Sequence, residues 1–185
     1  MKYNCGELIH RMERGERLRF VLFWGEIEEA GRVTEACLSQ WYPCRFVVDD
    51  VAYGSAEHYM MAQKALLFGD REIYGKIMAA DTPDEMKALG RQIRNFDQDK
   101  WDASKYQIVV DGNAAKFGQN DALKAFLLGT GNAVLAEASP YDGIWGIQLA
   151  AEDPLATDPK CWQGENLLGF ALMEVRDLIR GQEQP

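Results

Sequence analysis

Residues 53–65 read YGSAEHYMMAQKA, and this stretch decides how the middle of the chain folds. Serine is favoured just before the first residue of a helix, and glycine is common just after the last one. Ser55 and Gly69 therefore predict a helix from about residue 56 to residue 67.

Two charged residues lie on one face of this predicted helix. Glu57 falls in the first turn, where the positive end of the helix dipole favours an ionised carboxylate. Lys64 follows two turns later on the same face, with Met61 between them. The pattern suits a nucleophile, a base or a partner for a cation. A carboxylate that only complements the dipole and a solvated lysine fit the same spacing.

Short strands precede the helix. Residues 18–24 (LRFVLFW) predict a buried strand, and residues 25–35 form a charged loop. Residues 46–48 and 51–53 predict a hairpin that turns at an Asp-Asp pair.

More helices follow it. They are predicted at residues 101–117, from residue 120 to about 129, and at 166–180, with short strands at 133–136 and 144–147. Regular alternation of strands and helices is absent, so the fold class is α+β and mainly helical, with a few short strands.

A capping box opens one further helix at Thr82, with proline at the first helical position. Lys87, Arg91 and Arg94 follow at helical spacing, so they predict one positive face. Arginine binds phosphate oxygens through two donors, so this face suits a phosphate or diphosphate. A solvated face paired with neighbouring acidic residues fits the same spacing.

Two carboxylates, Glu137 and Asp142, lie close to Trp145 and Gly146. They follow a predicted strand, where catalytic loops are common. A tryptophan face can stack on a base, although a core tryptophan and a simple Asp-Gly turn fit equally well. Asn166 then begins the last helix, either as its N-cap or with its amide turned toward a base or a ribose hydroxyl.

Composition narrows the class of protein. The chain has 185 residues, enough for one domain with its own core. A net charge of -9 and a pI near 4.8 argue against coating of nucleic acid or binding to anionic membranes. No signal-like start, no membrane-length apolar run and no C-x-x-C pair occur, and there are only two histidines. We therefore expect a cytoplasmic protein with reduced thiols and no metal site.

Taken together, these motifs resemble the NADAR family, which includes the YbiA-type glycosidases. The resemblance covers nearly all of residues 38–178, and Gln40 and Gln148 are its two departures, since asparagine and glycine are common there. The matching motifs are LSQWYP at 38–43, EHYMMAQKA at 57–65, FGD at 68–70, KALGR at 87–91, Trp101, AKF at 115–117, residues 135–146, WQGENLLG at 162–169 and LM at 172–173.

The resemblance implies a single YbiA-like catalytic domain at residues 32–182, preceded by an extension at residues 1–31 that is partly strand. It implies an N-glycosidase without metal or organic cofactor, which breaks the bond between ribose C1 and a nitrogen. The expected substrate is a small nucleotide-like molecule, a ribosylamino-pyrimidine phosphate of riboflavin biosynthesis. One alternative is removal of ADP-ribose from guanine in nucleic acid, and another is an inactive module that binds nucleotide or ADP-ribose.

Roles for individual residues follow from this reaction. Glu57 stabilises the cationic sugar or orients water, and Lys64 pairs with Glu57 or attacks C1 as an amine. Asp142 or Glu137 assists the leaving nitrogen. The remaining expected contacts with substrate are Arg91 and Lys87 for phosphate, Trp101 or Trp145 for stacking, and Gln40, Trp41, Tyr42, His58, Gly146 and Asn166.

Overall fold

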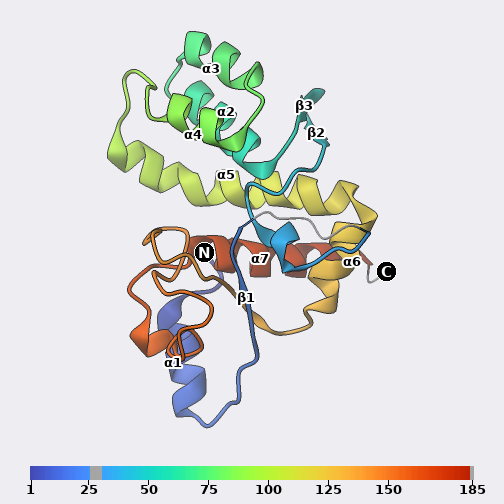
Figure 1. The fold of residues 1–185 in the computed structure, drawn as a ribbon, viewed down its shortest axis with the longest axis vertical. Coiled ribbons are helices and arrows are strands. Elements are labelled where there is room, and N and C mark those ends of the chain that lie inside the picture. Colours follow the sequence, from blue (N-terminus) through green and yellow to red (C-terminus); the bar gives the residue numbers. More distant parts are fainter. Residues whose placement is uncertain (26–30, 184–185) are drawn as a thin grey trace. The chain divides into compact units, whose positions relative to one another are not determined.

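The computed structural model describes residues 1–25 and 31–183, which form two compact units (Figure 1). The terminal unit contains Met1–Ser39 and Asp121–Pro185, and the middle unit contains Gln40–Asn120. Part of the charged loop predicted at residues 25–35 lies outside the described residues. The fold is α+β and mainly helical, as predicted.

The middle unit is a helical cluster with one hairpin. Figure 1 shows α2, α3 and α4 gathered on one side of the long helix α5, and α2 contacts the other three. Its elements are β2 (Phe46–Val48), β3 (Val51–Tyr53), α2 (Ala56–Leu67), α3 (Arg71–Met78), α4 (Pro83–Gly90) and α5 (Gln98–Gln119).

The predicted hairpin and the predicted helix after it are both confirmed. Strands β2 and β3 pair antiparallel, with Asp49 and Asp50 at φ 49° and 61° in the turn. A two-residue turn of this kind requires positive φ at both positions. Ser55 caps α2 by accepting a hydrogen bond from the His58 amide at 3.1 Å, and Gly69 follows the helix at φ 71°.

Glycine allows α5 to approach α2 closely. A Cβ at Gly112 would lie 2.5 Å from the Tyr59 ring. The glycine in the predicted helix at 101–117 is therefore a packing contact, and the helix continues through it from Gln98 to Gln119.

The terminal unit joins the two ends of the chain. Strands β1 and β4 pair in parallel, from Phe20 opposite Val134 to Phe23 opposite Glu137, and α7 packs on β4. Its elements are α1 (Cys5–Glu13), β1 (Phe20–Phe23), the 3-10 helix η1 (Glu35–Leu38), α6 (Asp121–Gly129), β4 (Val134–Glu137), the 3-10 helix η2 (Pro159–Cys161) and α7 (Leu167–Glu183).

Two strand predictions need correction. The strand predicted at residues 18–24 spans only Phe20–Phe23, and Trp24 lies beyond its end with 57% of its surface exposed. Residues 144–147 form a turn instead of a strand. Their carbonyl groups accept hydrogen bonds from the first amides of α7, such as Leu167 N to Ile144 O and Leu168 N to Trp145 O.

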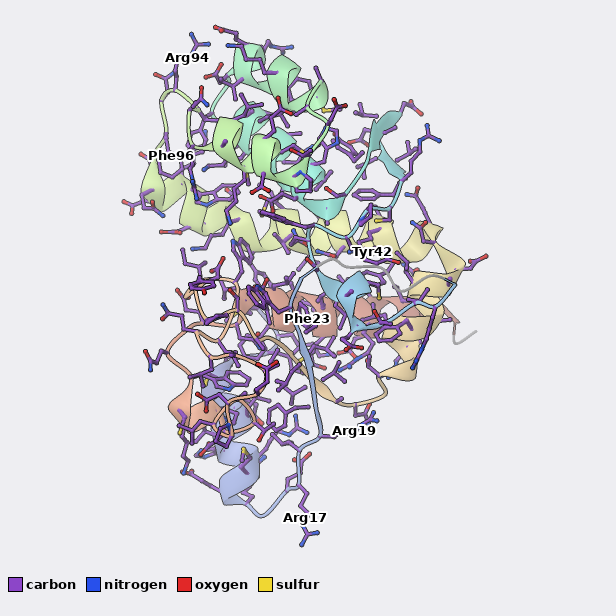
Figure 2. All side chains as sticks on the ribbon, in the orientation of Figure 1. Arg17, Arg19, Phe23, Tyr42, Arg94 and Phe96 are labelled. Carbon is purple, nitrogen blue, oxygen red and sulfur yellow. The ribbon has the colours of Figure 1, made fainter. Side chains whose placement is uncertain are left out.

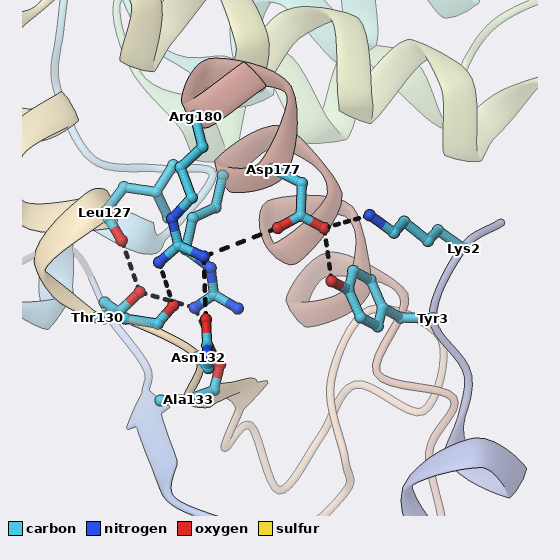
Figure 3. A network of polar contacts seen from close by, with 10 residues as sticks. Lys2, Tyr3, Leu127, Thr130, Asn132, Ala133, Asp177 and Arg180 are labelled. Atoms are coloured by element: carbon cyan, nitrogen blue, oxygen red, sulfur yellow. Dashed lines mark hydrogen bonds and ion pairs between the residues drawn. The ribbon is translucent and has the colours of Figure 1, made fainter. Parts of the chain in front are cut away.

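Arginine side chains hold the turn between α6 and β4 (Figure 3). Arg176, only 2% exposed, donates to Thr130 Oγ1 at 2.8 Å and to Ala133 O at 2.9 Å. Arg180 donates to Gly131 O at 2.5 Å, and Arg19 donates to Thr130 O. These cations bind oxygen atoms of residues 130–133, the segment that joins α6 to β4.

The described residues contain no helix that is both long enough and apolar enough to cross a membrane.

Candidate active site

Lys64, near the end of α2, has an unusual environment for a lysine. Its side chain is half-buried, and its Nζ donates to Gly90 O at 3.1 Å. The same atom lies 4.6 Å from the centre of the Phe96 ring and 5.1 Å from that of Trp101. Figure 2 shows Phe96 on the segment that joins α4 to α5. The ammonium is therefore held by aromatic faces and one carbonyl.

Opposing effects set the pKa of Lys64. Burial lowers it, the negative charge of Glu57 raises it, and the positive charge of Arg91 lowers it again. The net result is a pKa below the usual value for lysine. A larger fraction of this amine is therefore neutral near pH 7 than in a solvated lysine.

Glu57 lies in the first turn of α2 and is only 3% exposed. Its amide donates to Gln40 O at 2.9 Å, and this bond ties the start of α2 to the segment before the hairpin. The carboxylate is thus buried beside the positive end of a helix and within electrostatic reach of Lys64.

A close contact between α2 and α4 brings the Gly90 carbonyl to Lys64. A Cβ at Gly90 would lie 2.2 Å from Met61 Sδ, so only glycine fits here without displacing the methionine. Met61 is one turn before Lys64 on the face where the sequence places both. Met61 and Lys64 of the predicted wall therefore contact α4 at Gly90.

The positive face predicted for Lys87, Arg91 and Arg94 does not lie on one helix. Helix α4 ends at Gly90, Arg91 is its C-cap, and Arg94 lies in the segment that follows. Arg94 instead donates to the buried Asp70 carboxylate through its backbone amide, Nε and Nη2, at 2.7–3.0 Å. The arginine lowers the pKa of Asp70 well below its usual range. Arg94 therefore anchors the segment that carries Phe96.

Arg91 and Lys87 have different surroundings. Arg91 is exposed, and its charge acts on Lys64. Lys87 is half-buried, with its Nζ 5.5 Å from the centre of the Trp41 ring.

Three other predicted contact residues are buried in the middle unit. Gln40 Oε1 accepts from Asn113 Nδ2 at 2.7 Å. Tyr42 lies 5.6 Å from Lys116 Nζ, measured to the ring centre. His58 Nδ1 accepts from the Gly54 amide at 3.2 Å, and burial lowers the pKa of this imidazole. These contacts tie the three residues to neighbouring parts of the middle unit, and their part in substrate binding stays a prediction.

The second predicted group lies in the terminal unit, at the carboxyl end of β4. Glu137 is the last residue of that strand. Asp142 Oδ1 accepts from the amides of Ile144 and Trp145 at 2.9 and 2.8 Å, which fixes the turn. Gly146 allows the chain to fold back, because a Cβ there would lie 2.9 Å from Glu137 O.

The Asn166 amide holds β4. Its Oδ1 accepts from Glu137 N at 3.1 Å, and its Nδ2 donates to Leu135 O at 3.0 Å. The side chain is fully buried, and both of its polar atoms bind the strand. Gly169, near the start of α7, packs against the same strand.

Sequence reasoning missed Phe96, the Gly90 carbonyl and the Asp70–Arg94 pair. Asp70 carries a recognisable signal, because it caps α3 by accepting from Ile73 N at 3.2 Å. The role of Phe96 leaves no pattern in the sequence, since it depends on where the α4–α5 segment folds.

A shallow depression of about 440 Å³ lies over the hairpin of the middle unit. None of the residues that line it is a carboxylate, whereas Glu57 acts on Lys64. We therefore take the surroundings of Lys64 as the candidate active site. Its lining residues are Pro43, Cys44, Arg45, Ala52, Tyr53 and Gly54.

Comparison with known proteins places this chain among glycosidases. The model of the NADAR domain matches residues 22–180. An N-glycosidase of Acanthamoeba polyphaga mimivirus is 43% identical over 164 residues, which cover 86% of this chain and 95% of that protein. A riboflavin biosynthesis protein of Vibrio vulnificus is 31% identical over 143 residues, which cover 77% of this chain and 35% of that protein.

The structural comparison agrees. The NMR structure of YbiA from Escherichia coli matches with a TM-score of 0.71 at 26% identity, over 92% of this chain and 91% of that one. The match confirms the expected YbiA-like fold.

Proposed function

The chain belongs to the NADAR domain family and is an N-glycosidase, and we propose that it hydrolyses the ribose C1–N bond of a phosphorylated, nucleoside-like substrate. The observation that carries this proposal is the environment of Lys64. A half-buried amine with a lowered pKa lies within the field of a buried carboxylate, Glu57. A carboxylate stabilises the positive charge that builds on the sugar as the nitrogen leaves, and a neutral amine can attack C1.

Glu57 is the group that we assign to the cationic sugar. A preorganised carboxylate in a buried site stabilises positive charge more strongly than water does. The start of α2 holds it in place through its cap and through the bond from the Glu57 amide to Gln40 O. Glu57 either pairs with the sugar cation or orients the water that attacks C1.

Lys64 offers a covalent route. In a ring-opened sugar, the Lys64 amine adds to C1, and the bond from C1 to the substrate nitrogen then breaks. The departing nitrogen takes the two protons that Nζ gives up, which leaves a Schiff base between Lys64 and C1. Water hydrolyses this Schiff base to the free sugar and the amine. The lowered pKa of Lys64 supports this route, because attack requires the neutral amine.

Other roles are assigned by position and chemistry. Arg91, with Lys87, is the candidate for binding the substrate phosphate. Trp101 lies beside the Lys64 ammonium, which suits a ring that lines the sugar site. The part of Asp142, Glu137 or Trp145 in departure or stacking of the base stays a prediction, and Asp142→Asn and Glu137→Gln variants test it.

The substrate that we favour is a ribosylamino-pyrimidine phosphate of riboflavin biosynthesis. The similarity to a protein named for riboflavin biosynthesis supports this choice. To test it, the protein is incubated with that compound and, separately, with DNA that carries ADP-ribosylated guanine, and products are followed by mass spectrometry. Ribose 5-phosphate from the first supports the proposal, whereas free ADP-ribose from the second alone would replace it with the alternative. No product from either would contradict the proposed reaction.

A matched experiment tests the covalent route. Borohydride added during turnover reduces a Schiff base to a stable amine, so sugar mass on the Lys64 peptide is expected. Lys64→Ala is expected to lose both the adduct and the activity. An active Lys64→Ala variant would leave the Glu57 and water route in its place.

We also propose a cytoplasmic location. The four cysteines, Cys5, Cys37, Cys44 and Cys161, are free thiols, which suits a reducing compartment. Cell fractionation tests this location.

A further inference from the structure

An ion pair holds the centre of the segment that joins α4 to α5. The Asp70 carboxylate, which caps α3, accepts a hydrogen bond from the Ile73 amide at 3.2 Å and three from Arg94 at 2.7–3.0 Å. The Asp70 side chain is fully buried, whereas that of Arg94 is 62% exposed. Arg94 is therefore located by its paired bonds to Asp70 more than by packing.

Phe96 lies two residues beyond Arg94 on the same segment (Figure 2). Asn95, between them, has φ 56°, a left-handed conformation that asparagine adopts more readily than most residues, and it turns the chain there. The Phe96 ring lies 5.1 Å from the Phe68 ring and 4.6 Å from Lys64 Nζ, measured to ring centres. Because 43% of Phe96 stays exposed, its position depends on the path of the segment and not on enclosure in a core.

Phe96 covers the solvent side of the Lys64 amine. The other ring beside Nζ belongs to Trp101, which is buried in the first turn of α5, and the Gly90 carbonyl accepts the hydrogen bond from Nζ. Of the two rings, only that of Phe96 is substantially exposed. Water in place of this ring would solvate the ammonium and favour the charged form of the amine.

We propose that Asp70 and Arg94 are positioning residues that hold Phe96 over Lys64, and that this cover shields the amine from water and keeps it reactive. This role rests on the proposed function, in which the neutral amine attacks C1 of the sugar. Neither member of the ion pair touches the sugar: the pair acts through Phe96, and Phe96 acts through Lys64.

The first measurement is the pH dependence of Lys64 acylation by acetic anhydride, followed by mass spectrometry of the Lys64 peptide. Arg94→Gln and Phe96→Ala are both expected to raise the pKa of Lys64, because burial is the largest effect that lowers it and both substitutions expose the amine. Acylation at neutral pH should therefore slow several-fold. Glu72→Gln is the matched control, since it removes only the exposed partner of Arg94, at 3.1 Å, and should label like the unaltered protein.

The second measurement is turnover of the ribosylamino-pyrimidine phosphate. Arg94→Gln and Phe96→Ala should lower kcat by roughly ten- to a hundredfold, as misplacement of a reacting group does. The acid limb of the pH profile should move to higher pH together with the acylation curve. The variant that carries both substitutions should be no worse than the more affected single variant, because residues that act through one another are not additive.

An unchanged Lys64 pKa in folded Phe96→Ala would overturn the role of the cover. That variant leaves the ion pair intact, so it is decisive even where Arg94→Gln does not fold. Arg94→Lys, which keeps the charge but loses the paired bonds, then tests the ion pair, and a normal acylation curve in this variant would overturn the positioning role. Additive losses in the double variant would overturn it as well.

Acylation needs no substrate, so the two proposals can fail separately. Shifted acylation in the variants, with no product from the unaltered protein, would reject the proposed reaction alone. Product from the unaltered protein, with unshifted acylation in the variants, would reject the cover alone.

Discussion

Gly169→Ala is the substitution whose consequences can be worked out most fully. A Cβ at this position would lie 2.1 Å from Leu135 O and 2.6 Å from both polar atoms of the Asn166 amide. Real Cβ atoms essentially never come within 3.0 Å of such a neighbour, and Leu135 O belongs to a strand that cannot easily give way. Helix α7 must therefore retreat from β4 by about 0.9 Å, from 2.1 Å to the 3.0 Å minimum.

The energetic cost has three parts. Overpacking of this kind costs about 1–3 kcal/mol. The bond from Asn166 Nδ2 to Leu135 O, now 3.0 Å, would stretch beyond hydrogen-bonding distance and leave buried polar atoms unpaired, at about 1–3 kcal/mol. In the opposite direction, the greater helix propensity of alanine stabilises the folded protein by about 0.5–1 kcal/mol. The expected net loss in the free energy of unfolding is about 1–5 kcal/mol.

The assay is urea unfolding followed by circular dichroism, with Gly181→Ala as the control. Gly181 lies in the same helix and has nothing within 4 Å of its would-be Cβ, so alanine there should be neutral or stabilising. Turnover should fall with stability in Gly169→Ala, because Asn166 also holds the Glu137 amide. A Gly169→Ala protein as stable as the unaltered one would refute the reasoning.

Other predictions concern the charged residues of the middle unit. Glu57→Gln should lower turnover by more than about a hundredfold without changing the fold, and a folded variant with normal turnover would contradict its role. Glu57→Gln should also lower the pKa of Lys64 further, whereas Arg91→Ala should raise it. The pH dependence of amine labelling measures the Lys64 pKa in each variant. If both substitutions moved this pKa in the same direction, the opposite effects of the two charges would be contradicted. Arg91→Ala should also weaken the binding free energy of a phosphorylated substrate by about 1.5–3 kcal/mol, and that of its dephosphorylated analogue much less. Equal losses of binding free energy for the two ligands would indicate a structural role for Arg91. Asp70→Asn should destabilise the protein at neutral pH. Arg94 holds the pKa of folded Asp70 below its unfolded value, so this stabilisation is complete above about pH 4 and is lost as the pH falls further. The urea midpoints of the Asp70→Asn variant and of the unaltered protein should therefore approach each other as the pH is lowered. A difference between the two midpoints that does not change with pH would argue against the ion pair.

Local signals predicted much of the fold. The ends of α2 follow from Ser55 and Gly69, and the hairpin follows from its Asp-Asp turn, because caps and turns depend on neighbours within a few residues. The end of α4 was not predictable in this way. Lys87, Arg91 and Arg94 keep helical spacing, yet the chain leaves the helix at Gly90, and Arg94 is bound by Asp70, which is 24 positions away.

The candidate site was predictable to a similar extent. The sequence places Glu57 and Lys64 on one helix face, and in the structure the charge of Glu57 raises the pKa of Lys64 while burial lowers it. Phe96 beside Lys64 and the exposed Trp24 did not follow from the sequence. An apolar residue at a segment end looks the same in the sequence whether it is buried, exposed or placed against a charge.

The pairing of β1 with β4 has a consequence for how the protein folds during synthesis. Phe20 and Val134 are partners although 113 residues separate them, so β1 leaves the ribosome long before its neighbour exists. The middle unit has all its own contacts once Asn120 is made, and bonds such as Asn113 to Gln40 join its two ends. Closing so long a loop is slow. Residues 1–39 can complete the terminal unit only after residues 121–185 have been made. Strand β1 is thus translated well before β4 and is among the last elements to reach its native pairing.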